Sequence, residues 1–384
     1  MNGREFAINL RRSGVGRHAA FGIVGGYGTT GRVVVPELLK SGEAEIAIAG
    51  RDGAKLNSAA AEFDSRVSAT RLDIMDARSM GEFCSRCSVV VNCAGPVMLL
   101  RDRVAQAAFR AHCHYLDLAG MGLVKEAMLP HGREIADLGL SFVVSAGWMP
   151  GLTDLLPVYA YAQARPRMDS IESVSVYFSD SGDWSDNALR DGFSHLRKAG
   201  LFRPGYFRNG EWVRAKASEA SRKVDVGDPI GTRRFSLLSM PELDEVGRRL
   251  AECEFRSYAY LAGLRNAVAA VAIALMPLPE KSGVRLLRGM FRRNRLPVAG
   301  FVVAHVVGRS EGRRAALRAS VEFDAGREYW MNGVVLATAA CMVSAGKGVQ
   351  HGVRFLSDAL EPVALMDALR KAGVRLTESF ASCD

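Results

Sequence analysis

Three glycines near the start of the chain have the spacing that holds a phosphate group. Gly26-Tyr27-Gly28-Thr29-Thr30-Gly31 matches G-x-G-x-x-G, directly after the apolar run Phe21–Val24 and directly before a helical run, Arg32–Lys40. In such a turn Gly26 permits the sharp bend, Gly28 lets the backbone approach a pyrophosphate, and Gly31 allows close packing of helix on strand. The motif therefore predicts a dinucleotide site, with hydroxyl donors available from its two threonines.

The end of the second apolar run predicts which dinucleotide is bound. An NAD site usually carries an acidic residue about 20 positions after the glycines, which accepts from the ribose 2′-hydroxyl. Here the run ends Ala49-Gly50-Arg51-Asp52. Gly50 leaves room and Arg51 supplies a cation where a 2′-phosphate would sit, which favours NADP. Asp52 could bind the ribose instead, although its place before Gly53-Ala54-Lys55 suits a helix cap better.

The remaining cofactor contacts are expected at the ends of the next strands. Asp73 follows the run Ser68–Leu72 and is predicted to reach the adenine edge. The residues predicted near the nicotinamide follow the fourth run and are Asn92, Cys93, Ala94, Gly95 and Pro96. For Cys93 we expect packing rather than nucleophilic chemistry, because a small buried thiol is usually inert.

Asp117 and Tyr115 are the candidate catalytic residues. Hydride transfer leaves the protein to orient the acceptor and to supply a proton or a counter-charge. Asp117 leaves the fifth run at the carboxyl edge, where doubly wound folds bind ligands, and alternation places Tyr115 on the same face. Asp117 could steady an iminium or relay a proton, and it could equally cap the following turn. His114 begins the run, so we expect it to pack.

A second group of residues is predicted to line the acceptor pocket. The residues that flank the crossing between domains are Trp148, Met149 and Asp154. Trp184 and Arg190 lie in Gly182–Asp191, which we read as a junction loop, and Phe202–Asp228 has a similar composition.

We predict no metal site and no hydrolase site. Cys84-Ser85-Arg86-Cys87 has C-x-x-C spacing without a second ligand pair. The neighbours in His112-Cys113-His114 point to opposite faces of a strand and seldom share one ion. No G-x-S-x-G nucleophile elbow supports hydrolysis.

The elements that would position these residues alternate regularly. Between Ala20 and Ser145, apolar runs of strand length alternate with helical segments, which predicts an α/β fold with a doubly wound parallel sheet (Rossmann). The predicted strands are Phe21–Val24, Glu45–Ala49, Ser68–Leu72, Ser88–Cys93, Tyr115–Leu118 and Ser141–Ser145, and the helices are Thr29–Ser41, Ala54–Phe63, Met80–Cys84, Asp102–Ala111 and Val124–Leu138. After Gly151, alternation in Ile171–Phe178 and a pair of runs, Gly300–Val307 and Ala315–Phe323, predict a second α+β domain.

Composition restricts the partners. Lys and Arg number 50 against 41 Asp and Glu, and the net charge of +9 favours anionic partners. The basic run Arg285–Arg295 holds a single aromatic residue, so nucleic acid is not expected.

The cysteines and the N-terminal segment predict the compartment. The seven cysteines are scattered and Met1–His18 reads as a polar leader, and together they predict a reducing cytoplasm. The longest apolar stretch, Ala267–Leu278, is too short to span a bilayer and is predicted to be a buried helix, with a surface-seeking helix as the alternative.

Several of these motifs recur together in one family. The chain resembles the saccharopine dehydrogenase-like (saccharopine reductase) family through Gly25-Gly26-Tyr27-Gly28, Ala49-Gly50-Arg51-Asp52, Asn92-Cys93-Ala94-Gly95-Pro96, His114-Tyr115-Leu116-Asp117-Leu118, Pro150-Gly151-Leu152-Thr153-Asp154 and the closing stretch Gly348–Val374. The resemblance implies that a substrate domain interrupts the cofactor domain. We therefore expect a dinucleotide-binding domain over 19–150, completed by 335–384, and an inserted substrate and dimerisation domain over 151–334.

The resemblance implies an NADPH-dependent oxidoreductase with two alternative reactions, and the apolar and basic segment Ala267–Arg295 adds a third, non-catalytic alternative. The first is reduction of an imine in a small carboxylated amino-acid or polyamine-type substrate. The second is reduction of an enoyl group on an acyl or polyketide chain that an acidic carrier holds. The third is a non-catalytic NADP-binding protein at a membrane surface, bound through Ala267–Arg295. A homodimer without an integral membrane span is expected in each case.

Overall fold

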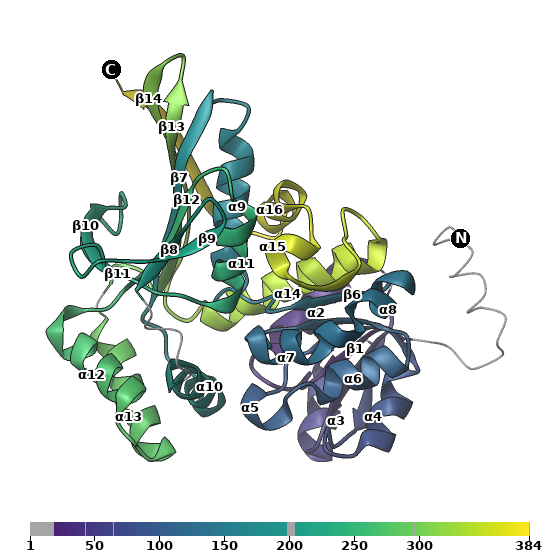
Figure 1. Ribbon diagram of the computed structural model, residues 1–384. Helices are drawn as coiled ribbons and strands as arrows, with labels where there is room; N and C mark the ends of the chain where they lie inside the picture. The colour runs from purple at the N-terminus through teal and green to yellow at the C-terminus, as the bar shows by residue number, and fades with distance from the viewer. Residues whose placement is uncertain (1–18, 43, 64, 198–203, 295, 384) are drawn as a thin grey trace.

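The computed structural model describes residues 19–383 apart from 43, 64, 198–203 and 295, so the predicted leader Met1–His18 lies outside it. Two sheets form the centres of the molecule, and the helices cover and join them (Figure 1). The α/β fold with a doubly wound sheet and a second domain is confirmed.

The first sheet is parallel throughout. Its strands, in spatial order, are β15 (Gly352–Phe355), β6 (Ser141–Val144), β5 (His114–Asp117), β4 (Cys87–Asn92), β1 (Ala19–Val24), β2 (Ile46–Gly50) and β3 (Val67–Arg71). The central strands are apolar on both faces because helices cover both sides of the sheet. The chain order reverses between β1 and β4, and a doubly wound sheet binds its ligand at the crevice formed there.

The helices of this domain follow the predicted segments closely. They are α2 (Gly31–Lys40), α3 (Gly53–Glu62), α4 (Ala77–Cys84), α5 (Val97–Leu100), α6 (Arg103–Arg110), α7 (Met121–Met128), the 3-10 turn η1 (Leu129–His131) and α8 (Gly132–Asp137). The segment predicted as one helix over Val124–Leu138 is divided at η1, where Pro130 lacks the amide hydrogen that a continuous helix needs.

The second sheet is mixed and consists of nine strands. Its path runs through β10 (Ser221–Asp225), β11 (Thr232–Leu237), β12 (Glu254–Tyr260), β7 (Ser170–Asp180), β13 (Gly300–Ser310), β14 (Arg313–Phe323) and β16 (Leu376–Cys383), while β8 (Gly205–Arg208) pairs with β12 and with β9 (Glu211–Arg214). The hairpin of β13 and β14 is the antiparallel pair that the sequence predicts.

Two long helices connect the sheets. α9 (Leu152–Ala164) packs on β7 and β13, while α14 (Glu328–Ala345) packs on α2 and on strands of the first sheet. Further helices beside them are α11 (Pro241–Arg249), α15 (Leu356–Ala359) and α16 (Pro362–Lys371). One continuous apolar core includes residues of both sheets and of both long helices. The segment predicted to complete the cofactor domain contributes to both sheets, because β15 joins the first sheet and β16 pairs with β14 of the second.

Three helices form a cap beside the cofactor domain: α10 (Asp186–Arg197), α12 (Gly263–Leu275) and α13 (Glu280–Arg293). In Figure 1, α10 lies between the cofactor domain and the pair α12–α13. The loop predicted over Gly182–Asp191 therefore runs into a helix, which buries Leu189 and Phe193 one turn apart. Phe202–Asp228, also predicted as loop, holds β8, β9 and β10 within its described part.

The helix α12 is not the buried helix that its apolar sequence predicts. Its inner face packs against α10 and α13, whereas Val268, Val271, Leu275 and the following Met276 are exposed. Among the described residues, no helix is long and apolar enough to cross a membrane.

Candidate active site

The glycine turn leaves space and free amides for a pyrophosphate. A Cβ on Gly31 would lie 2.5 Å from the Gly25 carbonyl oxygen, so only glycine lets α2 begin this close to β1. A Cβ on Gly28 would meet only that same oxygen, at 3.1 Å, and otherwise faces open space. The amides of Thr29 and Thr30 have no recorded intramolecular partner. The tight bend itself falls at Gly25, whose φ is +80°, one residue before the glycine that the motif suggested.

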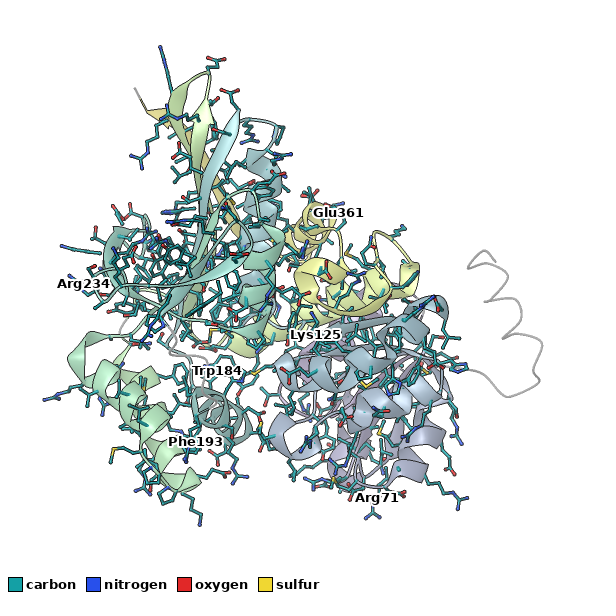
Figure 2. All side chains as sticks on the ribbon, in the orientation of Figure 1. Arg71, Lys125, Trp184, Phe193, Arg234 and Glu361 are labelled. Carbon is teal, nitrogen blue, oxygen red and sulfur yellow. The ribbon has the colours of Figure 1, made fainter. Side chains whose placement is uncertain are left out.

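The ends of β2 and β3 bring two arginines together. Asp52 caps α3 by accepting from the Lys55 amide at 3.1 Å, as the cap interpretation predicts. The Arg71 Nε donates to the Arg51 carbonyl oxygen at 3.3 Å, and both side chains are exposed. Figure 2 shows Arg71 at the outer end of the cofactor domain. The Tyr27 ring occupies the space beside Gly50, because a Cβ on Gly50 would lie 2.2 Å from Tyr27 Cε1.

One cavity of about 480 Å³ connects the cofactor domain with the cap. On one side it is lined by the turn Gly28–Thr30, by 92–95 after β4 and by 117–120 after β5. On the other side the lining comes from the end of β7, from β12 and from the cap helices. Its size lies within the range of about 300–1,000 Å³ that is usual for small-molecule sites.

Asp117 and Tyr115 both line this cavity. The Asp117 Oδ1 accepts from the amides of Gly120 and Ser145, so the carboxylate does cap the following turn. Its Oδ2 is buried, and the Tyr115 side chain is a hydrogen-bonding neighbour of the carboxylate. Burial raises the pKa of Asp117 to about 6, although the two amide donors oppose the shift. Burial and the nearby Asp117 charge raise the pKa of Tyr115 well above its usual value.

A second buried carboxyl group, Asp180, lines the cavity from the end of β7. Its Oδ1 accepts from the Gly182 amide, and its buried carboxylate has the side chains of Trp184 and Trp148 as hydrogen-bonding neighbours. Burial raises the pKa of Asp180 to about 7, and the charge of Glu328 contributes in the same direction. Asp180 is therefore partly protonated near neutral pH.

The cap supplies an apolar end to the cavity. Leu261, Ala270, Leu287, Met290 and Phe291 line it. Among the described residues, the lining contains neither lysine nor arginine. The titratable side chains of the lining are therefore chiefly carboxyl groups, Asp117, Asp180 and Asp191, together with the imidazole of His195.

Hydrogen bonds connect the cap to the nicotinamide side of the cofactor domain. The Asp191 carboxylate on α10 accepts from the amides of Val97 and Met98 at 2.9 and 3.2 Å. These amides begin α5, where the helix dipole favours a negative charge. Asn187 Nδ2 donates to the Gly95 carbonyl oxygen at 3.3 Å. Through these contacts α10 closes over the loop that follows β4.

Comparisons with known proteins agree with this geometry. The model of the saccharopine dehydrogenase NADP-binding domain matches residues 21–143. Residues 21–143 are thus similar to the NADP-binding domain of saccharopine dehydrogenases. The protein is accordingly an NAD(P)-dependent oxidoreductase that binds a nicotinamide cofactor.

Solved structures share the architecture of this oxidoreductase at low sequence identity. Saccharopine dehydrogenase (L-Glu forming) from Saccharomyces cerevisiae is 14% identical, and the match covers 94% of this chain and 100% of that chain with a TM-score of 0.60. A probable dehydrogenase from Thermotoga maritima is 10% identical over 93% of this chain and 98% of that chain, with a TM-score of 0.48. No curated protein sequence matches the chain. The yeast enzyme supports the fold of the whole chain.

The other predicted acceptor residues lie in three places: the cavity lining, the protein interior and the surface. Met149 and Trp184 line the cavity, and Figure 2 shows Trp184 at the junction of the domains. Trp148 is buried, with its ring edge-on to Phe323 at a centroid distance of 4.8 Å. Asp154 is buried in α9 and accepts from the Ser357 amide at 3.0 Å. Arg190 is exposed and pairs with Glu280 at 3.3 Å.

The predicted cofactor residues of the oxidoreductase are likewise distributed along the strand ends. Cys93 lines the cavity beside Asn92, Ala94 and Gly95, and burial raises its pKa to about 12, so its thiol stays protonated. Pro96 lies just outside that lining, at the start of α5. The Asp73 carboxylate accepts from the Met75 amide after β3. Among the described residues, no cluster of three His, Cys, Asp or Glu side chains is arranged to hold a metal ion.

Sequence reasoning missed three polar groups of this site: Asp180, Asp191 and Asn294. Asp180 lies two residues after the alternating run Ile171–Phe178, and a carboxylate at the end of a strand was a usable signal. Asn294 binds the Asp180 backbone oxygen through its Nδ2 at 3.0 Å, and this long-range contact left no local pattern in the sequence.

Proposed function

We propose that this oxidoreductase uses NADPH to reduce a carbon–nitrogen double bond in an amine-type substrate. The observation that carries the proposal is the cavity lining, in which two buried carboxyl groups accompany apolar side chains and the described part contains no lysine or arginine. An iminium cation is stabilised by a nearby carboxylate in a region of low dielectric. The polyamine-type half of the predicted substrate class fits this lining better than a carboxylated amino acid, which would need a cation.

Each carboxyl group has a role in this proposal. Bound NADPH supplies the hydride that the acceptor carbon receives. Asp117 lines the cavity at the end of β5, and its carboxylate would stabilise positive charge on the substrate nitrogen. Asp180, with a pKa raised to about 7, holds a proton near neutral pH and can deliver it to the nitrogen of a neutral imine. The reaction then consumes one imine, one NADPH and one proton, and yields the amine and NADP⁺.

The preference for NADP over NAD is part of the proposal. Asp52 caps α3, which supports the interpretation of that residue as a helix cap. Arg51 and Arg71 lie together where a 2′-phosphate would approach, and guanidinium groups bind phosphate strongly. Calorimetric titration with NADPH and NADH should give tighter binding of NADPH, and equal affinities would reject this preference.

The activity is tested by following NADPH oxidation with imines formed from apolar amines. Consumption should be faster with amine-type imines than with matched imines that carry a carboxylate. Asp180→Asn should lower kcat by about 100-fold, as expected for loss of a general acid, while NADPH binding is retained. Asp183→Asn is the matched control because Asp183 is exposed nearby. An Asp180→Asn variant with unchanged kcat would reject the assigned proton donor.

A second candidate is reduction of an enoyl group on a carrier-held chain. The apolar end of the cavity, formed by Leu261, Leu287 and Met290, favours an aliphatic chain. Supplying enoyl thioesters in place of imines distinguishes the two reactions, since NADPH consumption with the thioester alone would replace the imine proposal.

We also propose that the protein is a homodimer in a reducing cytoplasm. Support for the compartment comes from the six described cysteines, which are all free. Light scattering tests the mass, and titration of thiols in cell extracts tests the oxidation state.

A further inference from the structure

The exposed face of α12 is the most unusual surface among the described residues. Val268, Val271 and Leu275 are spaced by three and four residues, so they lie on one face of the helix. Their exposed fractions are 59%, 52% and 79%, and the following Met276 is 52% exposed. A contiguous strip of large apolar side chains in water normally marks a surface that binds something.

The opposite face of α12 is already used. Ala269, Ala270 and Ile273 pack against Leu189 and Phe193 of α10 and against α13. Ala270 also lines the cavity. The apolar composition of the helix is therefore needed for packing on one side only, and the cap does not require the exposed strip for its own stability.

The neighbouring helix α13 carries an excess of positive charge. Arg288 pairs with Asp186, and the single acidic residue of α13, Glu280, pairs with Arg190. On α13, the exposed cations that form no ion pair with another described residue are Lys281, Arg285, Arg292 and Arg293. α12 and α13 pack against each other, so these cations lie on the helix beside the one that carries the apolar strip.

We propose that α12 and α13 dock the protein on an anionic lipid surface, with the apolar strip inserted among the acyl chains and the cations against the headgroups. Apolar insertion combined with basic residues is the chemistry of helices that lie in a membrane interface. Each cation near an anionic surface adds to the attraction. A second copy of this chain fits the face less well, because a twofold contact would bring two sets of unpaired cations together.

Docking also has a consequence for access to the cavity. The inner faces of the same helices supply Ala270, Leu287 and Met290 to its lining. A lipid surface at the outer face would therefore lie one helix layer from the apolar end of the cavity. The proposed lipid binding does not depend on which substrate the enzyme reduces, so it is tested by a binding measurement without substrate.

Flotation of the full-length protein with lipid vesicles tests the proposal. The protein should float with vesicles of phosphatidylcholine mixed with phosphatidylglycerol and not with phosphatidylcholine alone. The double variant Val271→Asp with Leu275→Asp should lower the bound fraction by about tenfold or more. Each change removes an apolar side chain that would insert into the lipid, and each adds a negative charge that the anionic headgroups repel. Leu129→Asp is the matched control, because Leu129 is 51% exposed on the cofactor domain.

A charge variant provides an independent measurement. Arg285→Glu with Arg292→Glu should also abolish flotation, and high salt should weaken binding of the unaltered protein. NADPH binding by each variant verifies that it is folded. Flotation of the unaltered protein at background level overturns the proposal, as does equal flotation of the α12 variant. A dimer that the α12 variant abolishes, without vesicle binding, would assign the face to a second copy of the chain.

Discussion

A buried carboxyl group outside the cavity lining should make the stability of the protein depend strongly on pH. Glu242 in α11 is fully buried, and neither of its carboxylate oxygens has a recorded partner. Burial, reinforced by the charge of Asp154, raises the pKa of Glu242 from 4.5 to about 8. Glu242 is therefore protonated in the folded protein across a range in which it is ionised in the unfolded chain.

The sign and size of the effect follow from this shift in pKa. Above the unfolded pKa, unfolding releases a proton, so the free energy of unfolding falls as pH rises towards 8 and levels off above it. The difference of about 3.5 in pKa corresponds to about 5 kcal/mol in total, of which about 3 kcal/mol is lost between about pH 5 and pH 7.5. Glu242→Gln cannot titrate, so its stability relative to the unaltered protein should improve by that amount over the same range.

Urea denaturation at a series of pH values measures this difference. Glu134→Gln is the matched control because Glu134 is an exposed carboxyl on α8. Asp154→Asn should weaken the dependence as well, since the Asp154 charge contributes to the shift at Glu242. A constant stability difference between Glu242→Gln and the unaltered protein at every pH would refute the reasoning.

Three further changes test the site. Gly31→Ala places a Cβ 2.5 Å from the Gly25 carbonyl oxygen, and the resulting displacement of α2 should weaken NADPH binding at least about tenfold in calorimetry without unfolding the protein. Arg51→Ala should weaken NADPH binding about tenfold while NADH binding is unchanged, and a parallel loss for both cofactors would contradict a 2′-phosphate contact. Asp191→Ala removes both acceptors from the start of α5, so the Val97 and Met98 amides should exchange hydrogen faster, whereas unchanged exchange would show that α10 does not hold this loop.

The first sheet was predictable because its physics is local. β1, β4 and β6 are short apolar runs buried on both faces, and turn or capping residues bound them, so pattern and position agree. The glycine turn was equally predictable, since its role depends on the strand and the helix that directly flank it. Asp117 followed from the same logic, because the end of a parallel strand marks the ligand edge of the sheet.

The cap and the far side of the cavity were not predictable in this way. A helix that is apolar around much of its circumference, such as α12, does not reveal which face is buried until its neighbours are placed. Trp148 and Asp154 lie close in sequence to the domain crossing, yet both are buried in the protein interior, where Trp148 packs on Phe323 and Asp154 accepts from the Ser357 amide. Asp180 reaches the cavity because β7 pairs with β13 so that Asp180 lies opposite Gly300, a register set by residues more than 100 positions away.

The position of β15 has a consequence for how the protein is made. This strand pairs with β6 at the edge of the first sheet, although it comes from residues 352–355. On the ribosome, β1 to β6 emerge long before their last neighbour, so the exposed edge of β6 must wait for most of the chain to be synthesised. An open strand edge is a template for aggregation, and chaperone demand during synthesis should therefore fall when β15 emerges.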